Sequence, residues 1–98
     1  MALTSKQRSH LKSLAHHLEP VVRVGRGGAS DSVVSEVERT IDAHVLIKIR
    51  IELEDSSDRK AIAQEIAHQA DAEVVGSVGK ITILYRARKE NPSIRIPE

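Results

Sequence analysis

Hydrophobic and charged residues alternate most regularly in the middle of the chain, between positions 47 and 53. The run reads Ile-Lys-Ile-Arg-Ile-Glu-Leu, so that every odd position is apolar and every even position is charged. Successive side chains of a β-strand point to opposite faces, which makes this alternation typical of a half-buried strand. We predict a strand here, with one face packed on helices and with Lys48, Arg50 and Glu52 exposed on the other.

Three further segments repeat their apolar residues at the spacing of a helix. The first covers residues 5–18, with Thr4 and Gln7 forming a capping box and a buried stripe predicted at positions 11, 14, 15 and 18. The second begins at Ser30, a natural N-cap, and turns positions 34, 37 and 41 inward. The third covers about residues 58–72, with its inward side predicted at positions 62, 63, 66, 67 and 70.

Short apolar runs at residues 21–24, 74–78 and 81–85 predict three more strands. Only Gly79 and Lys80 separate the last two, which is typical of a hairpin. The resulting order is α-β-α-β-α-β-β. Strands joined through helices favour parallel pairing and the hairpin requires antiparallel pairing, so we expect an α/β two-layer sandwich with helices packed on a mixed four-stranded sheet.

A chain of this size is expected to form one domain. We predict a single domain over residues 1–98, with an ordered core of about residues 3–86 and a polar tail over residues 87–98, where Pro92 and Pro97 disfavour regular structure. The sequence shows neither an internal repeat nor a low-complexity segment.

The glycine-rich segment Gly25-Arg26-Gly27-Gly28 joins the predicted strand 21–24 to the predicted second helix. Such a corner brings backbone N–H groups and a helix N-terminus to a ligand, which suits a phosphate, although glycines at this position equally serve to permit a positive φ. Arg23 and Arg26 add guanidinium groups that match phosphate oxygens. The segment lacks both the nucleotide-triphosphate loop pattern and the third glycine of a dinucleotide fingerprint. A G-x-x-G loop of this kind favours contact with an RNA backbone over mononucleotide binding.

Charge is distributed unevenly along the chain, although the formal net charge is only +1. Residues 30–73 carry 11 acidic and 5 basic side chains, whereas the remainder carries 3 acidic and 10 basic ones. The predicted first helix contains no acidic residue, and Lys6 and Lys12 lie on the arc opposite its apolar stripe. We therefore expect one face of the protein to attract polyanions.

Several function classes are disfavoured by what the chain lacks. It has no cysteine, no phenylalanine and no tryptophan, and Tyr85 is its single aromatic residue of the Phe, Trp and Tyr class. Its five histidines are spaced so that they are not expected to meet at one metal ion. Its serines, histidines and carboxylates form no recognisable catalytic pairing. We expect no enzyme activity, no cofactor, no metal and no small-molecule substrate. The N-terminal residues have no apolar signal segment and no stretch is long enough to span a bilayer, so a cytoplasmic location is expected.

Blocks of residues spread over positions 3–86 closely resemble the YhbY family, the bacterial stand-alone form of the CRM domain, an RNA-binding module named for chloroplast RNA splicing and ribosome maturation. The matching blocks are Leu3-Thr4, Gln7, Leu11, Leu14-Ala15-His16, Leu18, Pro20-Val21-Val22, Gly25-x-x-Gly28, His44-x-Leu46-Ile47-Lys48, Gly79-Lys80 and Leu84-Tyr85-Arg86.

The resemblance implies a fold similar to the C-terminal domain of translation initiation factor three and association with precursors of the large ribosomal subunit. It maps the family's G-x-x-G loop onto Gly25 and Gly28. The chain departs from the family at Ala29 and Ser30, where members often have a larger apolar residue and a threonine.

Our first hypothesis is a non-enzymatic binder of structured RNA, with ribosomal RNA in large-subunit precursors as the expected partner. The predicted RNA-binding residues are Gly25, Arg26, Gly27, Gly28, Arg23, Lys6, Arg8, Lys12, Lys80, Arg86 and Arg88. The alternative is a protein-interaction module that docks a basic ribosomal protein through the acidic middle segment. A third and weaker hypothesis is a small nucleotide-using enzyme. The oligomeric state and the RNA element are left open.

Overall fold

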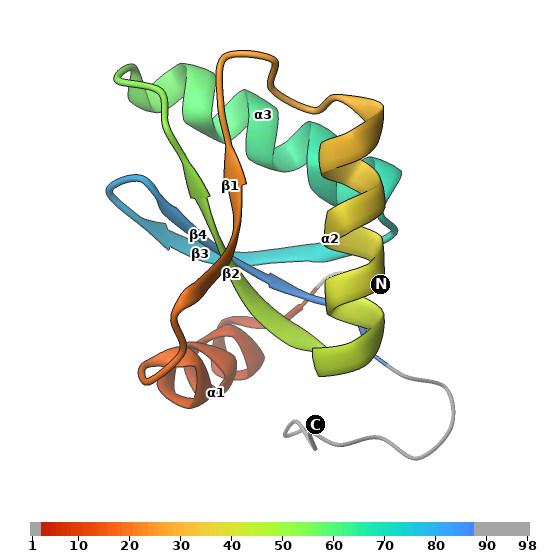
Figure 1. Cartoon of the computed structure of the whole chain (residues 1–98). Helices are drawn as coiled ribbons and strands as arrows, with labels where there is room; N and C mark the ends of the chain where they lie inside the picture. The colour runs from red at the N-terminus through yellow and green to blue at the C-terminus, as the bar shows by residue number, and fades with distance from the viewer. Residues whose placement is uncertain (1–2, 88–98) are drawn as a thin grey trace.

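The computed structural model describes residues 3–87 and contains, within that range, three helices and four strands in the predicted α-β-α-β-α-β-β order (Figure 1). The elements are α1 (Ser5–Ala15), β1 (Pro20–Val24), α2 (Asp31–His44), β2 (Leu46–Ile51), α3 (Ser56–Gln69), β3 (Glu73–Val78) and β4 (Ile81–Tyr85). The predicted tail lies outside the described residues except for Ala87.

The four strands form one sheet in the order β1-β2-β4-β3. Strands β1 and β2 are parallel and are joined through α2, whereas β4 pairs antiparallel with both β2 and β3. The turn between β3 and β4 uses Gly79 at φ +57°, a conformation that glycine adopts without steric cost. The mixed sheet and its hairpin are therefore confirmed.

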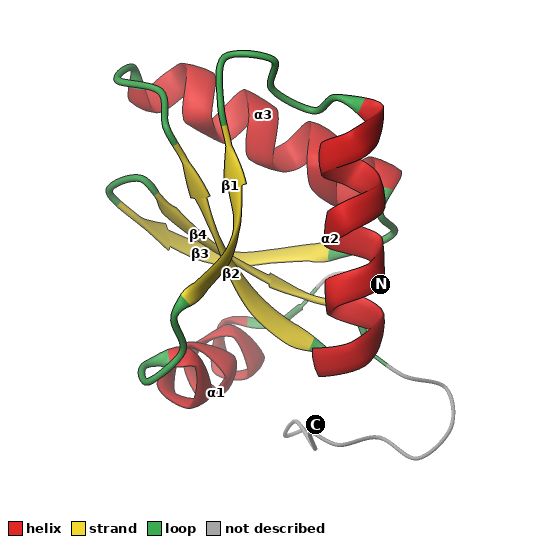
Figure 2. Cartoon of the chain, viewed as in Figure 1, coloured by secondary structure: helices red, strands yellow, loops and turns green. Residues whose placement is uncertain are grey.

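Helices cover both faces of the sheet (Figure 2). On one face, α2 and α3 pack on the larger core, to which β2 contributes Ile47, Ile49 and Ile51. On the other face, α1 packs on a smaller cluster that includes Leu46 and Ile83. The helices thus form a layer on each side, which the two-layer prediction did not anticipate. An amphipathic pattern identifies the buried side of a helix, but it does not say which face of the sheet that side meets.

Helix α1 is shorter and less buried than predicted. It ends at Ala15, and while Leu11 and Ala15 are fully buried, Leu14 is 43% exposed and Leu18 is 36% exposed. The prediction of Leu14 and Leu18 as buried is therefore wrong. Leu18 follows the end of the helix, so the helical spacing no longer applies to it. Leu14 lies beside the buried positions of α1, which are Leu11 and Ala15.

Each of the three helices begins directly after a residue whose side chain caps it. Thr4 and Gln7 form the predicted capping box of α1, and the hydroxyl of Ser30 accepts the backbone N–H of Val33 at the start of α2. Asp55 caps α3, which begins two residues earlier than predicted and ends three residues earlier. The predicted inward positions of α2 are buried, and those of α3 are buried except for the partly buried Ile62.

Candidate nucleic-acid interface

Three loops meet at the end of the sheet where β1 and β2 terminate. The N–H of Glu52 donates to the carbonyl of Val24 at 2.8 Å, and the N–H of Ile51 donates to the carbonyl of Lys80 at 2.8 Å. These bonds place the glycine loop, the segment after β2 and the β3–β4 turn beside one another. We call residues 25–30, 52–55 and 79–80 the loop end of the molecule.

The glycines of the loop have different roles. Gly28 is buried at φ +61°, and a Cβ there would lie 2.8 Å from the Cδ1 of Ile62. Its N–H donates to the carbonyl of Gly25 at 3.0 Å and closes the turn. Gly25 and Gly27 are exposed, have no atom within 4 Å of an added Cβ and do not have a positive φ. The fold therefore requires glycine at position 28, whereas Gly25 and Gly27 leave the backbone open to approach from solvent.

The N-terminus of α2 is partly satisfied by its own residues. Ser30 caps the helix, its N–H donates to the carbonyl of Gly28 at 2.9 Å, and Asp31 adds a carboxylate to the first turn. A carboxylate at a helix N-terminus already offsets the positive end of the dipole. The exposed groups at this corner are therefore Arg26 and the loop backbone, while the N-terminus of the helix is already capped.

The sheet face beside α1 carries a row of cations. We define the open face as the side chains of Arg23, Lys48 and Arg50 on β1 and β2. Lys12 of α1 lies over β3 and shares a groove with Lys48. Arg23 and Arg50 are partners in the parallel register of β1 and β2, so both side chains point to the same side of the sheet. The residues on either side of Arg23 in β1 are buried on the opposite face. The two arginines therefore stand side by side.

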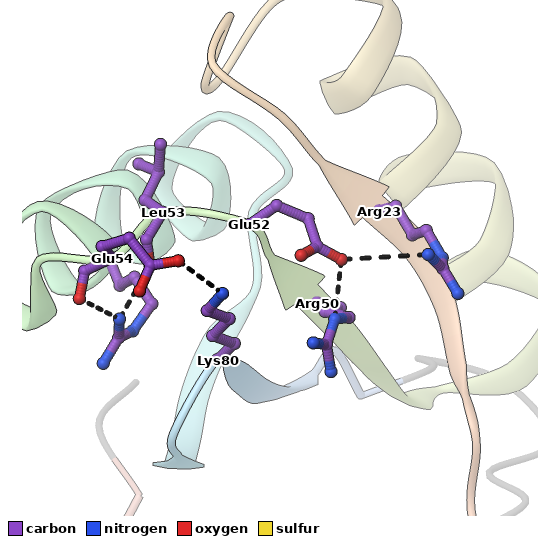
Figure 3. Close-up of polar contacts among 7 residues, drawn as sticks. Arg23, Arg50, Glu52, Leu53, Glu54 and Lys80 are labelled. Carbon is purple, nitrogen blue, oxygen red and sulfur yellow. Dashed lines mark hydrogen bonds and ion pairs between the residues drawn. The ribbon is translucent and has the colours of Figure 1, made fainter.

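One carboxylate lies between these two arginines. Oε1 of Glu52 is 2.6 Å from Nε of Arg50 and 3.9 Å from Nη1 of Arg23 (Figure 3). The Arg23 side chain is 81% exposed, while those of Arg50 and Glu52 are about one-third exposed, at 39% and 35%. Glu52 thus places a carboxylate against the cationic row at its loop end.

Lys80 is also paired at the loop end. Its Nζ lies 2.9 Å from Oε1 of Glu54, and this hydrogen bond and charge lower the pKa of the Glu54 carboxyl (Figure 3). The pKa of Asp55 is lowered mainly by the hydroxyl of Ser57 and by two backbone N–H groups at the start of α3. Lys80 therefore reaches the surface at the predicted place, next to a carboxylate.

Two predicted site residues make contacts that hold the fold together. The guanidinium of Arg8 donates to the carbonyls of Val74 and Val75, and that of Arg86 donates to the carbonyl of Ala70 at 2.9 Å. Arg86 also forms an ion pair with Asp42 at 3.6 Å. Its N–H bonds the residue before β2, so Arg86 lies at the end of the sheet opposite the loop end. These contacts anchor both guanidinium groups to neighbouring elements.

The other predicted residues fall in three places. Lys6 is exposed on α1, and Lys12 lies on the same helix beside the open face. Arg88 lies outside the described residues.

Lys48 and Arg50 were expected to be exposed but were not assigned to the site. The structure places Lys48 in one groove with Lys12 and Arg50 beside Arg23. The alternation of their strand could have pointed to them, because the charged side chains of one strand lie beside the side chains that neighbouring strands place on the same face.

Within residues 3–87, the His, Asp and Glu side chains form no group of three or more that could hold a metal ion. In the same part of the chain, no helix is long and apolar enough to cross a membrane.

The sequence and the fold of this chain are similar to those of known proteins. Residues 3–86 match the model of the CRS1 / YhbY (CRM) domain. The Pseudomonas aeruginosa protein named "Probable RNA-binding protein PA4753" is 40% identical over 86 residues, covering 88% of this chain and 83% of that protein. The Bacillus subtilis protein named "Probable RNA-binding protein YqeI" is 33% identical over 95 residues, covering 97% of this chain and 99% of that protein. The solution structure of SAV1595 from Staphylococcus aureus superimposes with a TM-score of 0.87 at 31% identity, covering 98% of this chain and all of that one.

Proposed function

The chain belongs to the CRS1 / YhbY (CRM) domain family, and we propose that it is a non-enzymatic, cytoplasmic RNA-binding protein. We further propose that its partner is ribosomal RNA in precursors of the large ribosomal subunit. The relatives named as RNA-binding proteins support the first part of this proposal. The second part rests on the resemblance of its sequence blocks to the YhbY family.

The observation that carries the proposal is that exposed and partly exposed cations adjoin the open glycine loop. Arg26 stands in the loop, and Arg23 and Arg50 stand side by side on the adjoining strands. Lys48 and Lys12 extend the same surface toward α1. Guanidinium and ammonium groups beside an unobstructed backbone suit a chain of phosphates, because each phosphate can form an ion pair while neighbouring backbone N–H groups donate hydrogen bonds to its other oxygens.

The mode of recognition follows from the lack of a large aromatic platform. Tyr85 is 5% exposed and packs in the core under α1, so its ring is not presented to a ligand. RNA-binding sheets that read sequence usually stack bases on exposed aromatic rings. We expect this protein to recognise the RNA backbone and its shape more than its base sequence.

A charge-reversal experiment tests the proposed surface. We expect the double variant R23E/R26E to lose RNA affinity by at least about tenfold while its circular dichroism stays native, because both side chains are exposed. The matched control is R39E/K60E, which makes the same charge change at exposed positions of α2 and α3. Equal losses in both variants would contradict a localised site.

The dependence of affinity on salt supplies an independent measurement. If about five phosphates are neutralised, the slope of log K against log salt on single-stranded RNA should be near −3.5. A slope near zero would contradict a phosphate-based mechanism.

The competing function, docking of a basic protein through the acidic segment, predicts the reverse pattern. Glu36, Glu38 and Asp42 are exposed on α2, on the face away from the cationic row. Under that function R23E/R26E would still co-sediment with large-subunit precursors, whereas reversal of the α2 acids would abolish co-sedimentation. Under the proposed RNA function the two outcomes are exchanged.

A further inference from the structure

A groove of about 540 Å³ lies between the end of α1 and the strands β2, β4 and β3. It is lined by Lys12, His16, Lys48, Val78, Ile81 and Ile83, among others. Its size is in the range of pockets that hold a small organic ligand. The groove borders the cationic row, since Ile81 is the register partner of Arg50 and Ile83 is the register partner of Lys48.

The wall formed by α1 depends on a glycine in the edge strand. An added Cβ at Gly76 would collide with the Cε of Lys12, so glycine at this position leaves room for the lysine stem to cross β3. The register of β3 shifts between Val74 and Gly76, and the Arg8 guanidinium donates to the carbonyls of residues 74 and 75 at that irregularity. The position of Lys12 over the strand is therefore supported by the backbone beneath it.

The chemistry of the groove combines an apolar side, a planar ring and positive charge. Val78 and the partly buried Ile81 supply aliphatic surface, and Val78 is 79% exposed. His16 lines the same space, and its imidazole makes an edge contact with the ring of His17, with centroids 5.2 Å apart. Lys12 and Lys48 stand at the groove, and among residues 3–87 none that lines it carries a carboxylate. This combination fits a flat, partly apolar ligand that carries negative charge.

We propose that the groove holds one unpaired nucleotide of the bound RNA. Its base lies between the imidazole of His16 and the aliphatic side chains of Val78 and Ile81, and its phosphates lie at Lys12 and Lys48. Histidine is one of the rings on which unpaired bases stack, so His16 takes the place of the aromatic residues that the chain lacks. This inference rests on the proposed RNA-binding function and adds a preference for single-stranded segments.

Three variants test the groove directly. We expect H16A to weaken binding to a single-stranded oligouridine by roughly tenfold, the scale of one lost base–ring contact, and H16F to restore it. V78S should weaken the same binding without touching the core, because Val78 is largely exposed. The control is H68A, which removes an exposed histidine from α3 on the other face. Affinity for a fully paired RNA duplex should be unchanged in all four variants.

The outcomes separate this inference from the function on which it rests. Loss of oligouridine binding in R23E/R26E together with unchanged binding in H16A and V78S would overturn the groove alone. Full oligouridine and duplex binding by R23E/R26E would overturn the proposed RNA surface. Equal losses of H16A on single-stranded and duplex RNA, or competition by an oligoglutamate peptide as effective as the RNA, would also overturn the assignment of the groove to an unpaired nucleotide.

Discussion

Individual glycines of the loop serve different purposes, and the purposes can be measured separately. Gly28 is required by a positive φ and by the closeness of Ile62, whereas Gly25 and Gly27 face open space with ordinary backbone angles. The sequence could not make this distinction, because the motif shows that glycines are present and not which of them adopts a left-handed conformation.

Substitution of the loop glycines should therefore divide stability from binding. We expect G28A to cost about 1–2 kcal/mol in the free energy of unfolding, because alanine resists a positive φ and crowds Ile62. G25A should leave stability unchanged or slightly higher and should weaken RNA binding by impeding close approach of a phosphate. Urea denaturation and fluorescence anisotropy measure the two effects. A G25A variant that unfolds as easily as G28A would contradict this division.

Glu52 is the residue whose charge opposes the cationic row most directly. Its contacts with Arg50 and Arg23 hold both guanidinium groups beside a carboxylate, where an RNA phosphate would otherwise compete. We expect E52Q to raise RNA affinity by about two- to fivefold, the scale of a partly exposed ion pair. The matched control is E36Q, which removes one exposed acidic charge from α2. Weaker binding by E52Q would mean that Glu52 orients the arginines for RNA instead of competing for them.

At the scale of elements, the ends of strands and helices decide where the functional groups meet. The hydrogen bonds between Glu52 and Val24 and between Ile51 and Lys80 bring three sequence-distant loops together. Capping patterns and alternation predicted the elements themselves, because both are local properties. They did not predict that α1 covers the opposite face from α2 and α3, which depends on how the apolar sides of separate elements pack together.

The N-cap of α2 offers a test at this scale, because it lies directly behind the glycine loop. Replacing Ser30 with alanine removes the hydrogen bond to the N–H of Val33 and should cost about 1 kcal/mol of stability. S30D keeps a capping oxygen, so we expect near wild-type stability but weaker RNA binding, since a second carboxylate would join Asp31 at the corner. Thermal denaturation with parallel binding titrations distinguishes the two. Unchanged affinity in S30D would argue against phosphate contact at this corner.

In the whole molecule, basic side chains gather on one face of the sheet and acidic side chains of α2 lie on the other side. Arg23, Lys48 and Arg50 come from two strands, yet they share one face with Lys12 of α1. Glu36, Glu38 and Asp42 are exposed on α2 across the sheet. The uneven distribution of charge along the sequence predicted a molecule with one basic face. It did not predict that Lys48 and Arg50, which lie within the acidic segment, would belong to that face.

Acid sensitivity should follow from the carboxylates of the loop end. The pKa values of Glu54 and Asp55 are lowered in the folded protein from ordinary values of 4.5 and 3.8. Their stabilising effect is therefore fully present above about pH 4.5 and is lost as the pH falls through the lower folded-state values. We expect urea midpoints to be insensitive to these two groups between pH 7 and pH 5 and to fall below that range. The variant E54Q/D55N should show a smaller acid-induced loss than the parent, and an identical loss would contradict this origin.

Sequence patterns alone predicted the order of helices and strands, the glycine corner and the excess of basic residues outside the acidic middle segment. These follow from alternation, capping and composition, which act between residues near one another in the chain. The three-dimensional structure was needed to show that Arg8 and Arg86 bind backbone carbonyls and that Leu14 is exposed. It was also needed to show that Lys48 shares a groove with Lys12 and that Arg50 stands beside Arg23. The physical reason is that strand register and helix packing set distances between residues far apart in sequence, and no local pattern contains those distances.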